Sequence, residues 1–282
     1  NQILAFVLVG NTILEIKGMY LEYWIILFSV SCFANMLGLN ISASFDSAVT
    51  IYILIPFLII PQLLLSGVIV KFEKLNPVIS IQKKVPMAGE IMASKWAFEA
   101  LSVNQFKNNK FNKQFYYIEK DLKNASFRKN FWLTRIKDKV HFIARNKNNP
   151  ELRTQVANGL LLLQTELRKE NELNSQIKYE NTADLGIDRL DDDLISGLND
   201  YLDDLNNFYI DEYKHFSNLK DELLIKLNKT EEDKALFVQL KDDYTNEAIE
   251  DLVTNKNDLD KIIEWDNELI RRADPIYKDP NG

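Results

Sequence analysis

Clustered carboxylates are the side chains in this sequence with the clearest potential for chemistry. Aspartates stand together at 191–193, 203–204 and 242–243, and grouped carboxylate oxygens can bind divalent cations. None of these groups has the spaced ligands and central glycine of a calcium-binding loop. Such runs are typical of a solvated helix face, and residues 191–193 also stand where a helix can begin, a position that favours acids. We therefore predict no metal site.

Nucleophilic and nucleotide chemistry have even less support in the sequence. His141 and His215 have no serine or cysteine partner in a catalytic pattern, and Cys32 stands alone in an apolar run. Neither a P-loop nor a dinucleotide-binding glycine motif occurs. The net charge of −7 argues against a nucleic-acid partner. We expect no catalytic residue and no cofactor in this segment, which by itself is then not an enzyme.

The elements that carry these residues divide sharply by composition. Hydrophobic residues make up 46% and charged residues 27% of the 282 residues, as in an ordinary soluble protein. Residues 1–70 nevertheless hold one Lys and three acidic residues, out of 34 Lys+Arg and 41 Asp+Glu in the chain. This split indicates a membrane part joined to a soluble part. Because the sequence starts without Met and inside an apolar stretch, we interpret it as an internal fragment of a longer polypeptide.

Three apolar runs in residues 1–70 predict transmembrane helices. Ala48–Val70 is free of charge and, as a helix, would be about 34 Å long, enough for a hydrocarbon core of about 30 Å. Tyr20–Leu39 is a second span with aromatic residues at one end, as in an interfacial belt. Asn1–Leu14 resembles the end of a third. Turns at 15–19 and 41–47 join these spans, so the 15–19 turn and everything after Val70 would share one side of the membrane.

The rest of the chain is predicted to be helical. In the juxtamembrane loop 71–109, residues 95–106 favour either a helix at the membrane surface or a helix packed beside the spans. Within 110–282, helix starts are indicated at Asn149 and Thr230. Apolar residues spaced by three or four from Leu190 to Leu227 predict a helix of roughly 40 residues, in a helical hairpin or a coiled coil. We find no strand alternation and expect an all-α fold: transmembrane helices plus an elongated, mostly helical soluble domain.

Three stretches within residues 20–106 resemble the membrane domain of the G subfamily of ABC transporters, the white-type half-transporters, in a bacterial-like form. The second and third spans end in NMLGLNISASFDSAVT and LLLSGVIVKFEKLNP, similar to the fourth and fifth helices of that family. The stretch KWAFEALSVNQF is similar to a segment of the family's last external loop, through Lys95, Trp96, Phe98, Glu99, Leu101, Asn104 and Phe106. The resemblance covers about a third of the chain. That family's last external loop is usually short, so the residues after Phe111 would be a large helical insertion.

The resemblance implies a type-2 ABC exporter permease with specific roles for single residues. Ile60, Leu63 and Asn35 would line a substrate cavity. A hydrophobic plug next to it would consist of Ser66, Gly67, Val68 and Ile69. ATP and Mg²⁺ would bind to a nucleotide-binding domain before Asn1, and a sixth helix would follow Gly282.

These inferences predict a part of the permease of an ATP-driven exporter. It would be a multi-pass protein of the cell (inner) membrane, with residues 71–282 external or periplasmic. We expect membrane lipid and a second transporter subunit as partners, in a homo- or heterodimer, and a cell-envelope protein as a partner of the insertion. The alternative is a membrane-tethered helical receptor or scaffold without transport activity.

Overall fold

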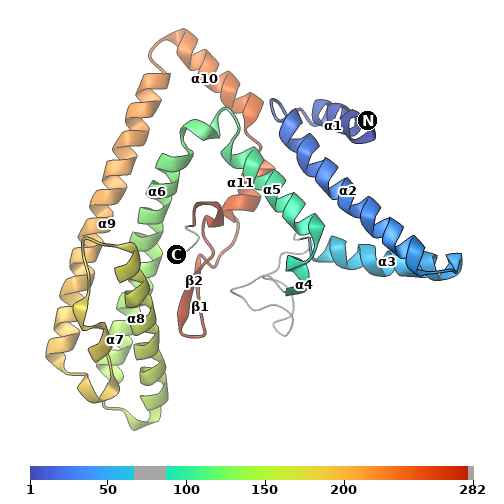
Figure 1. The fold of residues 1–282 in the computed structure, drawn as a ribbon. Coiled ribbons are helices and arrows are strands. Elements are labelled where there is room, and N and C mark those ends of the chain that lie inside the picture. The colour runs from blue at the N-terminus through green and yellow to red at the C-terminus, as the bar shows by residue number, and fades with distance from the viewer. Residues whose placement is uncertain (67–86, 279–282) are drawn as a thin grey trace. The chain divides into compact units, whose positions relative to one another are not determined.

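The computed structural model describes residues 1–66 and 87–278, and helices dominate it (Figure 1). The long elements are α1 (Gln2–Ile13), α2 (Tyr20–Ser44), α3 (Ala48–Leu64), α5 (Ala93–Lys107), α6 (Tyr116–Phe127), α7 (Leu133–Asn146), α8 (Arg153–Leu173), α9 (Asp192–Leu227), α10 (Glu231–Tyr244) and α11 (Glu247–Thr254). Shorter ones are α4 (Met87–Glu90), the π-helical turn η3 (Arg128–Trp132), the strands β1 (Ile262–Trp265) and β2 (Glu268–Arg271), and 3-10 turns η2 (Asn112–Gln114), η4 (Pro150–Leu152), η5 (Glu180–Asp184), η6 (Ile187–Arg189) and η7 (Pro275–Tyr277). The predicted all-α class is confirmed.

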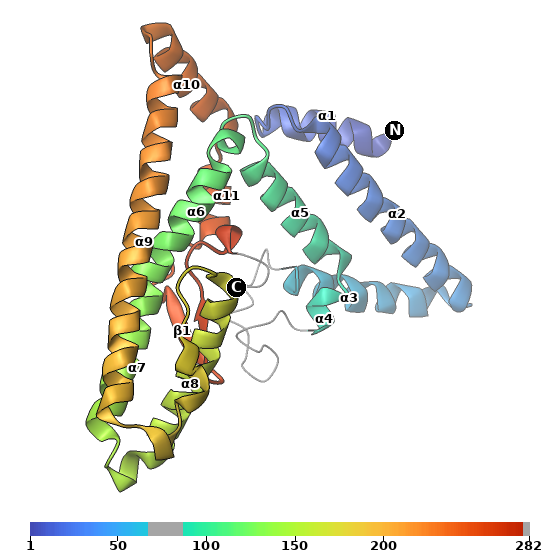
Figure 2. The ribbon, with the colours of Figure 1, turned by 60° about the vertical axis from the view of Figure 1, so that its left-hand side comes forward.

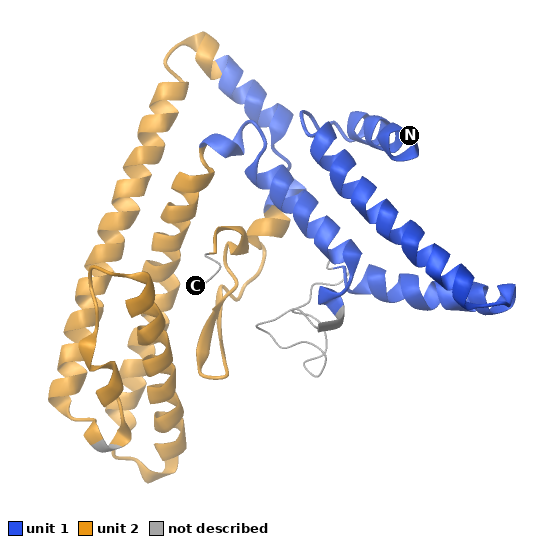
Figure 3. Ribbon diagram, viewed as in Figure 1, with its two compact units in different colours: residues 1–114, 235–250 blue, residues 115–234, 251–282 orange. Residues whose placement is uncertain are grey.

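The chain folds into two compact units (Figure 3). The first contains residues 1–114 and 235–250, and the second contains residues 115–234 and 251–282. This division differs from the one drawn from composition. Residues 235–250 are acidic and follow the long helix, yet they pack with the apolar helices of the first unit.

The helices α1 to α3 follow the predicted spans but have different lengths. The helix α2 has 25 residues, about 37 Å, and within the described ranges it is the helix that is long and apolar enough to cross a membrane. The helix α3 runs through Pro56 and Pro61 but has 17 residues, about 25 Å. Of the predicted span 48–70, residues 48–64 form α3, residues 65–66 follow it as a turn, and residues 67–70 lie outside the described residues. The Ser66 hydroxyl donates to the Leu63 carbonyl at 2.8 Å and so satisfies a helix end.

Large apolar side chains cover the outside of these three helices. Ile13, Tyr52 and Phe57 have exposed fractions of 73%, 76% and 70%. Neither α2 nor α3 has a fully buried residue. Apolar exposure on this scale is unfavourable in water, so these faces fit lipid or other helices of a membrane assembly.

The helix α5 packs against α2 and α3 in the first unit. In Figures 1 and 2, α5 runs beside α2, and α3 leads from the far end of α2 back to the start of α5. At the start of α5 the Ser94 hydroxyl donates to the Gln62 carbonyl of α3 at 2.9 Å. Near the end of α5, the Tyr23 hydroxyl of α2 donates to the Gln105 amide oxygen. Because α5 ends where α2 begins, the two helices run antiparallel.

In the second unit, α9 lies along the rod formed by α6, η3 and α7 (Figures 1 and 2). Three ion pairs show how α9 is oriented relative to α6 and α7. The later the partner lies in the α6–α7 segment, the closer the α9 partner lies to the start of α9. The pairs are Glu119–Lys220 at 2.8 Å, Lys137–Asp203 at 2.5 Å and Lys147–Asp192 at 2.6 Å. The helices are therefore antiparallel, and α9 pairs with helices of its own chain.

Apolar residues of α7, α8 and α9 form the core of the second unit. Its fully buried side chains include Trp132, Leu133, Ile136, Ile143, Leu162, Leu163, Leu167, Leu202 and Leu205. Each such side chain contributes about 1.5–3 kcal/mol through removal from water. The predicted apolar stripe of α9 buries only its first half: Leu198, Tyr201 and Leu205 are buried, whereas Phe216 and Leu223 are half-buried. The core therefore sits at one end of the long helix.

The helix starts predicted from capping residues are confirmed. The Asn149 side chain accepts from the Glu151 amide at 3.1 Å, before η4 and α8. Asp191 accepts from the Leu194 amide at 2.7 Å at the start of α9. Thr230 and Asp233 exchange two hydrogen bonds of 3.1 Å, a capping box at the start of α10.

Residues 262–271 form one small hairpin of strands, which the search for strand alternation did not find. The strands β1 and β2 pair antiparallel, with Ile263 opposite Ile270. Between them, Asp266 and Asn267 both have positive φ, 51° and 57°, as a tight two-residue hairpin turn requires. The strands have four residues each, too few for alternation to stand out from the charged surroundings.

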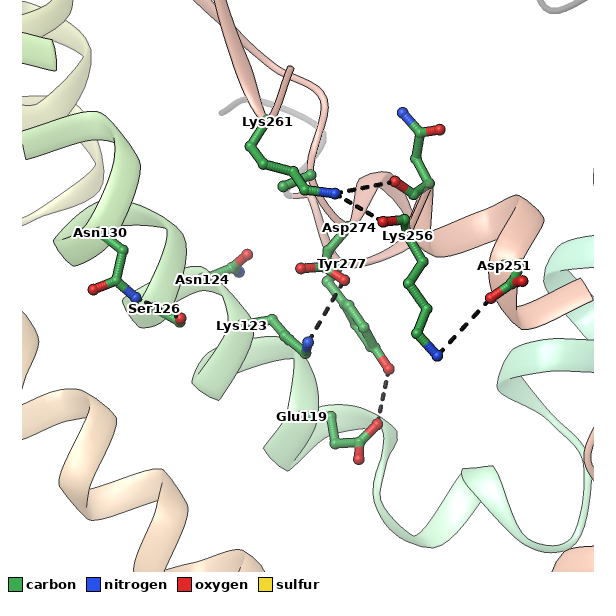
Figure 4. A network of polar contacts seen from close by, with 12 residues as sticks. Glu119, Lys123, Asn124, Ser126, Asn130, Asp251, Lys256, Lys261, Asp274 and Tyr277 are labelled. Atoms are coloured by element: carbon green, nitrogen blue, oxygen red, sulfur yellow. Dashed lines mark hydrogen bonds and ion pairs between the residues drawn. The ribbon is translucent and has the colours of Figure 1, made fainter. Parts of the chain in front are cut away.

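The C-terminal turn of the second unit is tied to α6 by the polar contacts in Figure 4. The Tyr277 hydroxyl donates to Glu119 at 2.8 Å, and the Lys123 ammonium lies 3.7 Å from Asp274. The Tyr116 hydroxyl donates to the Ile276 carbonyl at 3.0 Å. Residues 274–277 are thus fixed to the helix that opens the unit.

Candidate functional site

The three predicted cavity residues lie on two helices that diverge. Asn35 is exposed on α2, and Ile60 and Leu63 have exposed fractions of 54% and 51% on α3. The helices meet at their turn, residues 45–47, and separate from there (Figure 1). The structure therefore does not bring Asn35 together with Ile60 and Leu63 inside one chain. All three side chains remain accessible to another molecule.

Of the four predicted plug residues, the structure describes one. Ser66 is buried directly after α3, and its hydroxyl caps the Leu63 carbonyl. Gly67, Val68 and Ile69 lie outside the described residues. The plug accordingly stays a prediction.

The segment predicted to match an external loop forms α5, and it packs beside the spans. Its buried face carries Lys95, Ser102, Gln105 and Phe106. Trp96 is 52% exposed, on the side predicted to lie at a membrane surface. One face of α5 thus packs on α2 and α3, as in the second predicted arrangement, while a position at the membrane surface stays a prediction.

Lys95 is the centre of a charged cluster at the start of α5. Its buried ammonium lies 3.2 Å from Glu90 and 3.4 Å from Glu99. The same ammonium lies 3.7 Å from the centre of the Trp96 ring, whose indole N–H donates to the Glu90 carbonyl at 2.7 Å. Two carboxylates and an aromatic face compensate the buried charge, so this cluster fixes α4 to α5.

The other residues that resemble the family's external loop lie along α5 and contribute to its packing. Phe98, Leu101 and Asn104 are half-buried along the helix, and Asn104 lies one turn before Asn108, whose amide donates to it. Their positions are those of packing residues.

A polar pocket of about 180 Å³ lies in the first unit, and sequence reasoning missed it. It is lined by the turn before α2, the end of α5 and residues 242–246, including Glu15, Lys17, Gln105, Asn109, Asp243 and Tyr244. The Lys17 ammonium lies 2.5 Å from Asp243, and this ion pair raises the pKa of Lys17. The one available signal was that Lys17 is the lone basic residue of residues 1–70.

A metal centre finds no support in the part of the chain that the structure covers. In residues 1–66 and 87–278, no three His, Cys, Asp or Glu side chains gather closely enough to hold a metal ion. His141 and His215 are exposed on helices. The aspartate runs act instead through helix capping and ion pairing, as Asp191, Asp203 and Asp243 do.

One protein-family model matches the first five helices of the chain. Residues 2–106 match the model of the ABC-2 type transporter family, which covers α1 to α5. These residues are therefore similar to an ABC-2 type transporter membrane domain, and this similarity implies a membrane protein. No curated protein and no solved structure matched the chain.

Proposed function

We propose that this chain is part of the permease of an ATP-driven ABC transporter of the white-type G subfamily, working as an exporter. The observation that carries the proposal is the family match over residues 2–106, which coincides with helices whose apolar faces suit lipid. ATP and Mg²⁺ would bind to a nucleotide-binding domain outside residues 1–282. Residues 1–282 would supply part of the path of the substrate across the membrane and no catalytic group.

The divergence of α2 and α3 supports a cavity shared between two permease subunits. Asn35, Ile60 and Leu63 are exposed and do not meet within one chain. A second subunit, identical or related, would complete the cavity that they line. Transport would then follow alternating access, in which rearranged spans open the cavity to one side and Ser66–Ile69 part toward the other.

The contact between Lys17 and Asp243 supports the proposed sidedness. Asp243 belongs by sequence to the insertion, and Lys17 lies in the turn between the first two spans. A 2.5 Å ion pair requires both groups on one side of the membrane. We place this side outside the cell or in the periplasm, where residues 115–234 would contact a cell-envelope protein.

Labelling of single cysteines tests the topology. In the full-length protein with Cys32→Ala, Lys17→Cys and Asp46→Cys mark the turns at opposite ends of α2. A membrane-impermeant maleimide added to intact cells should label Lys17→Cys and leave Asp46→Cys unlabelled. Equal labelling of both cysteines would contradict the proposed topology.

Blocking the cavity tests the function. The full-length protein, in lipid nanodiscs with its nucleotide-binding domain, should hydrolyse ATP, and Ile60→Trp should lower the rate several-fold. Ile55→Trp is the matched control, because it lies about 140° away around the same helix. Wild-type protein without ATP hydrolysis would favour the receptor or scaffold instead.

A further inference from the structure

Residues 235–250 are separated from the matched membrane domain by more than a hundred residues, yet they pack in the same unit. Figure 3 shows them in the colour of the apolar helices. We call residues 235–250 the strap. The helices α10 and α11 each have one end in the strap and the other in the second unit. The strap is therefore continuous, through helical backbone, with the second unit.

Side chains hold the strap at three places in the first unit. Lys17 pairs with Asp243 at 2.5 Å. Lys110 lies over the Tyr244 ring, 5.1 Å from its centre. The Phe237 and Phe111 rings meet edge to face, with centroids 5.2 Å apart. The contacts combine charge, cation–π and apolar packing, so no single substitution removes them all.

The backbone before α2 makes a turn where the strap approaches. Gly18 has a φ of +75°, and a Cβ at this position would lie 3.4 Å from the Tyr244 ring. A residue with a side chain would be strained by its backbone at the point where the strap touches the turn. Glycine here thus serves the turn, while the distance to the ring is that of an ordinary contact.

The anchor point is also where α2 and α5 are fixed to each other. Tyr23 donates to Gln105 at this point. One turn further along the chain, buried Asn109 donates to the Gln105 and Phe106 carbonyls at 2.8 and 3.0 Å and accepts from the amides of Phe111 and Asn112. The strap consequently rests where hydrogen bonds join the start of α2, the end of α5 and the turn after α5.

We propose that the strap couples the second unit to the membrane domain, so that residues 235–250 move as one body with the 15–19 turn and the end of α5. Rearrangement of the spans would then be passed to the second unit through α10 and α11. The transport part of this idea rests on the function proposed above, whereas the docking itself does not.

Trapping of cysteine pairs tests the docking in the full-length protein with Cys32→Ala. Lys17→Cys combined with Asp243→Cys should be joined by a short bis-methanethiosulfonate crosslinker, which replaces the length lost with the lysine side chain, and the joined pair should lose its reactivity toward a polyethylene glycol maleimide. Asp46→Cys combined with Asp243→Cys is the matched control and should stay reactive, because Asp46 lies beyond the other end of the 25-residue helix α2. Equal trapping of both pairs, or of neither, would overturn the docking.

Charge reversal gives a second readout that does not require cysteines. Lys17→Glu or Asp243→Lys alone should speed amide hydrogen exchange in residues 235–244 about two- to fivefold, as expected for a partly exposed ion pair. The double variant should restore the wild-type rate. Unchanged exchange in both single variants would contradict a role for this pair.

ATP hydrolysis separates the coupling from the proposed function. If the strap moves with the spans, the crosslinked protein should hydrolyse ATP at the wild-type rate. Inhibition that a reductant reverses would mean that the strap must detach, and would overturn the coupling. Wild-type protein without hydrolysis would refute the proposed function, while trapping and exchange would still decide the docking.

Discussion

The guanidinium of Arg128 lies 3.2 Å from the carboxylate of Glu170, whose side chain is fully buried in the second unit. The Tyr209 hydroxyl donates to the same carboxylate. Arg128 also lies 4.9 Å from the centre of the Trp132 ring, at the ends of the π-helical turn η3. A charge pair inside an apolar core is costly to break, because the remaining partner keeps its charge without compensation.

Glu170→Gln should therefore destabilise the second unit by about 3–5 kcal/mol, and Arg128→Met combined with Glu170→Met should recover much of this loss. Denaturant unfolding of the purified full-length protein, with hydrogen exchange in α8 as the local probe, measures both effects. Glu172→Gln, an exposed neighbour on the same helix, is the control. A single variant as stable as this control would refute the role of the pair.

The stability of the second unit should fall in alkali. Burial, and then the negative charge of Glu170, raise the pKa of Tyr209 far above its ordinary value of about 10. The fold therefore holds a neutral phenol that ionises readily only after unfolding. This contribution is complete below pH about 10 and decreases above it, by about 1.4 kcal/mol per pH unit, until the pH reaches the folded-state pKa.

Tyr209→Phe should remove that part of the pH dependence while lowering stability near neutrality, because Glu170 loses a hydrogen bond. Unfolding measured between pH 8 and pH 11, with absorbance of tyrosinate followed in parallel, checks the slope. Tyr117→Phe, which changes an exposed ring, is the control. Identical slopes for Tyr209→Phe and wild type would contradict this explanation.

The capping box of α10 predicts a local effect. Thr230→Ala leaves the Asp233 amide without its acceptor and should cost about 0.5–2 kcal/mol at the start of the helix. Hydrogen exchange in residues 231–236 should speed up accordingly, whereas Thr230→Ser should keep most of the protection. If serine and alanine behave alike at this position, the hydroxyl is not the stabilising group.

Two glycines of the first unit should respond in opposite directions to alanine. Gly18 has a φ of +75°, so Gly18→Ala should destabilise by about 1–2 kcal/mol. Gly10 lies within α1 with open space around its Cα, so Gly10→Ala should be neutral or slightly stabilising. Thermal unfolding in detergent compares the two variants, and a stable Gly18→Ala would disprove the strain at the turn.

Local signals in the sequence predicted the helices well. Caps at Asn149 and Thr230 marked real starts, and the stripe from Leu190 to Leu227 falls, apart from Leu190 itself, in the single helix α9. These features depend on neighbours three or four residues apart, which the sequence displays directly.

Long-range relations escaped the sequence for a physical reason. Lys17 and Asp243 are 226 positions apart, and a lysine in a turn looks the same whether it faces water or a carboxylate. Glu170 likewise resembles any exposed helix glutamate, although it is fully buried. The hairpin at 262–271 was missed because its main signal is the Asp266–Asn267 turn and not the alternation of its short strands.

The edge-to-face contact between Phe111 and Phe237 joins the point where the chain leaves the first unit to the point where it comes back. Because these rings are in contact, the segment between them connects two neighbouring points of the first unit, as a tight loop would, whatever the length of the segment. Relatives could therefore lengthen, shorten or exchange this segment in evolution without rebuilding the part of the protein that sits in lipid.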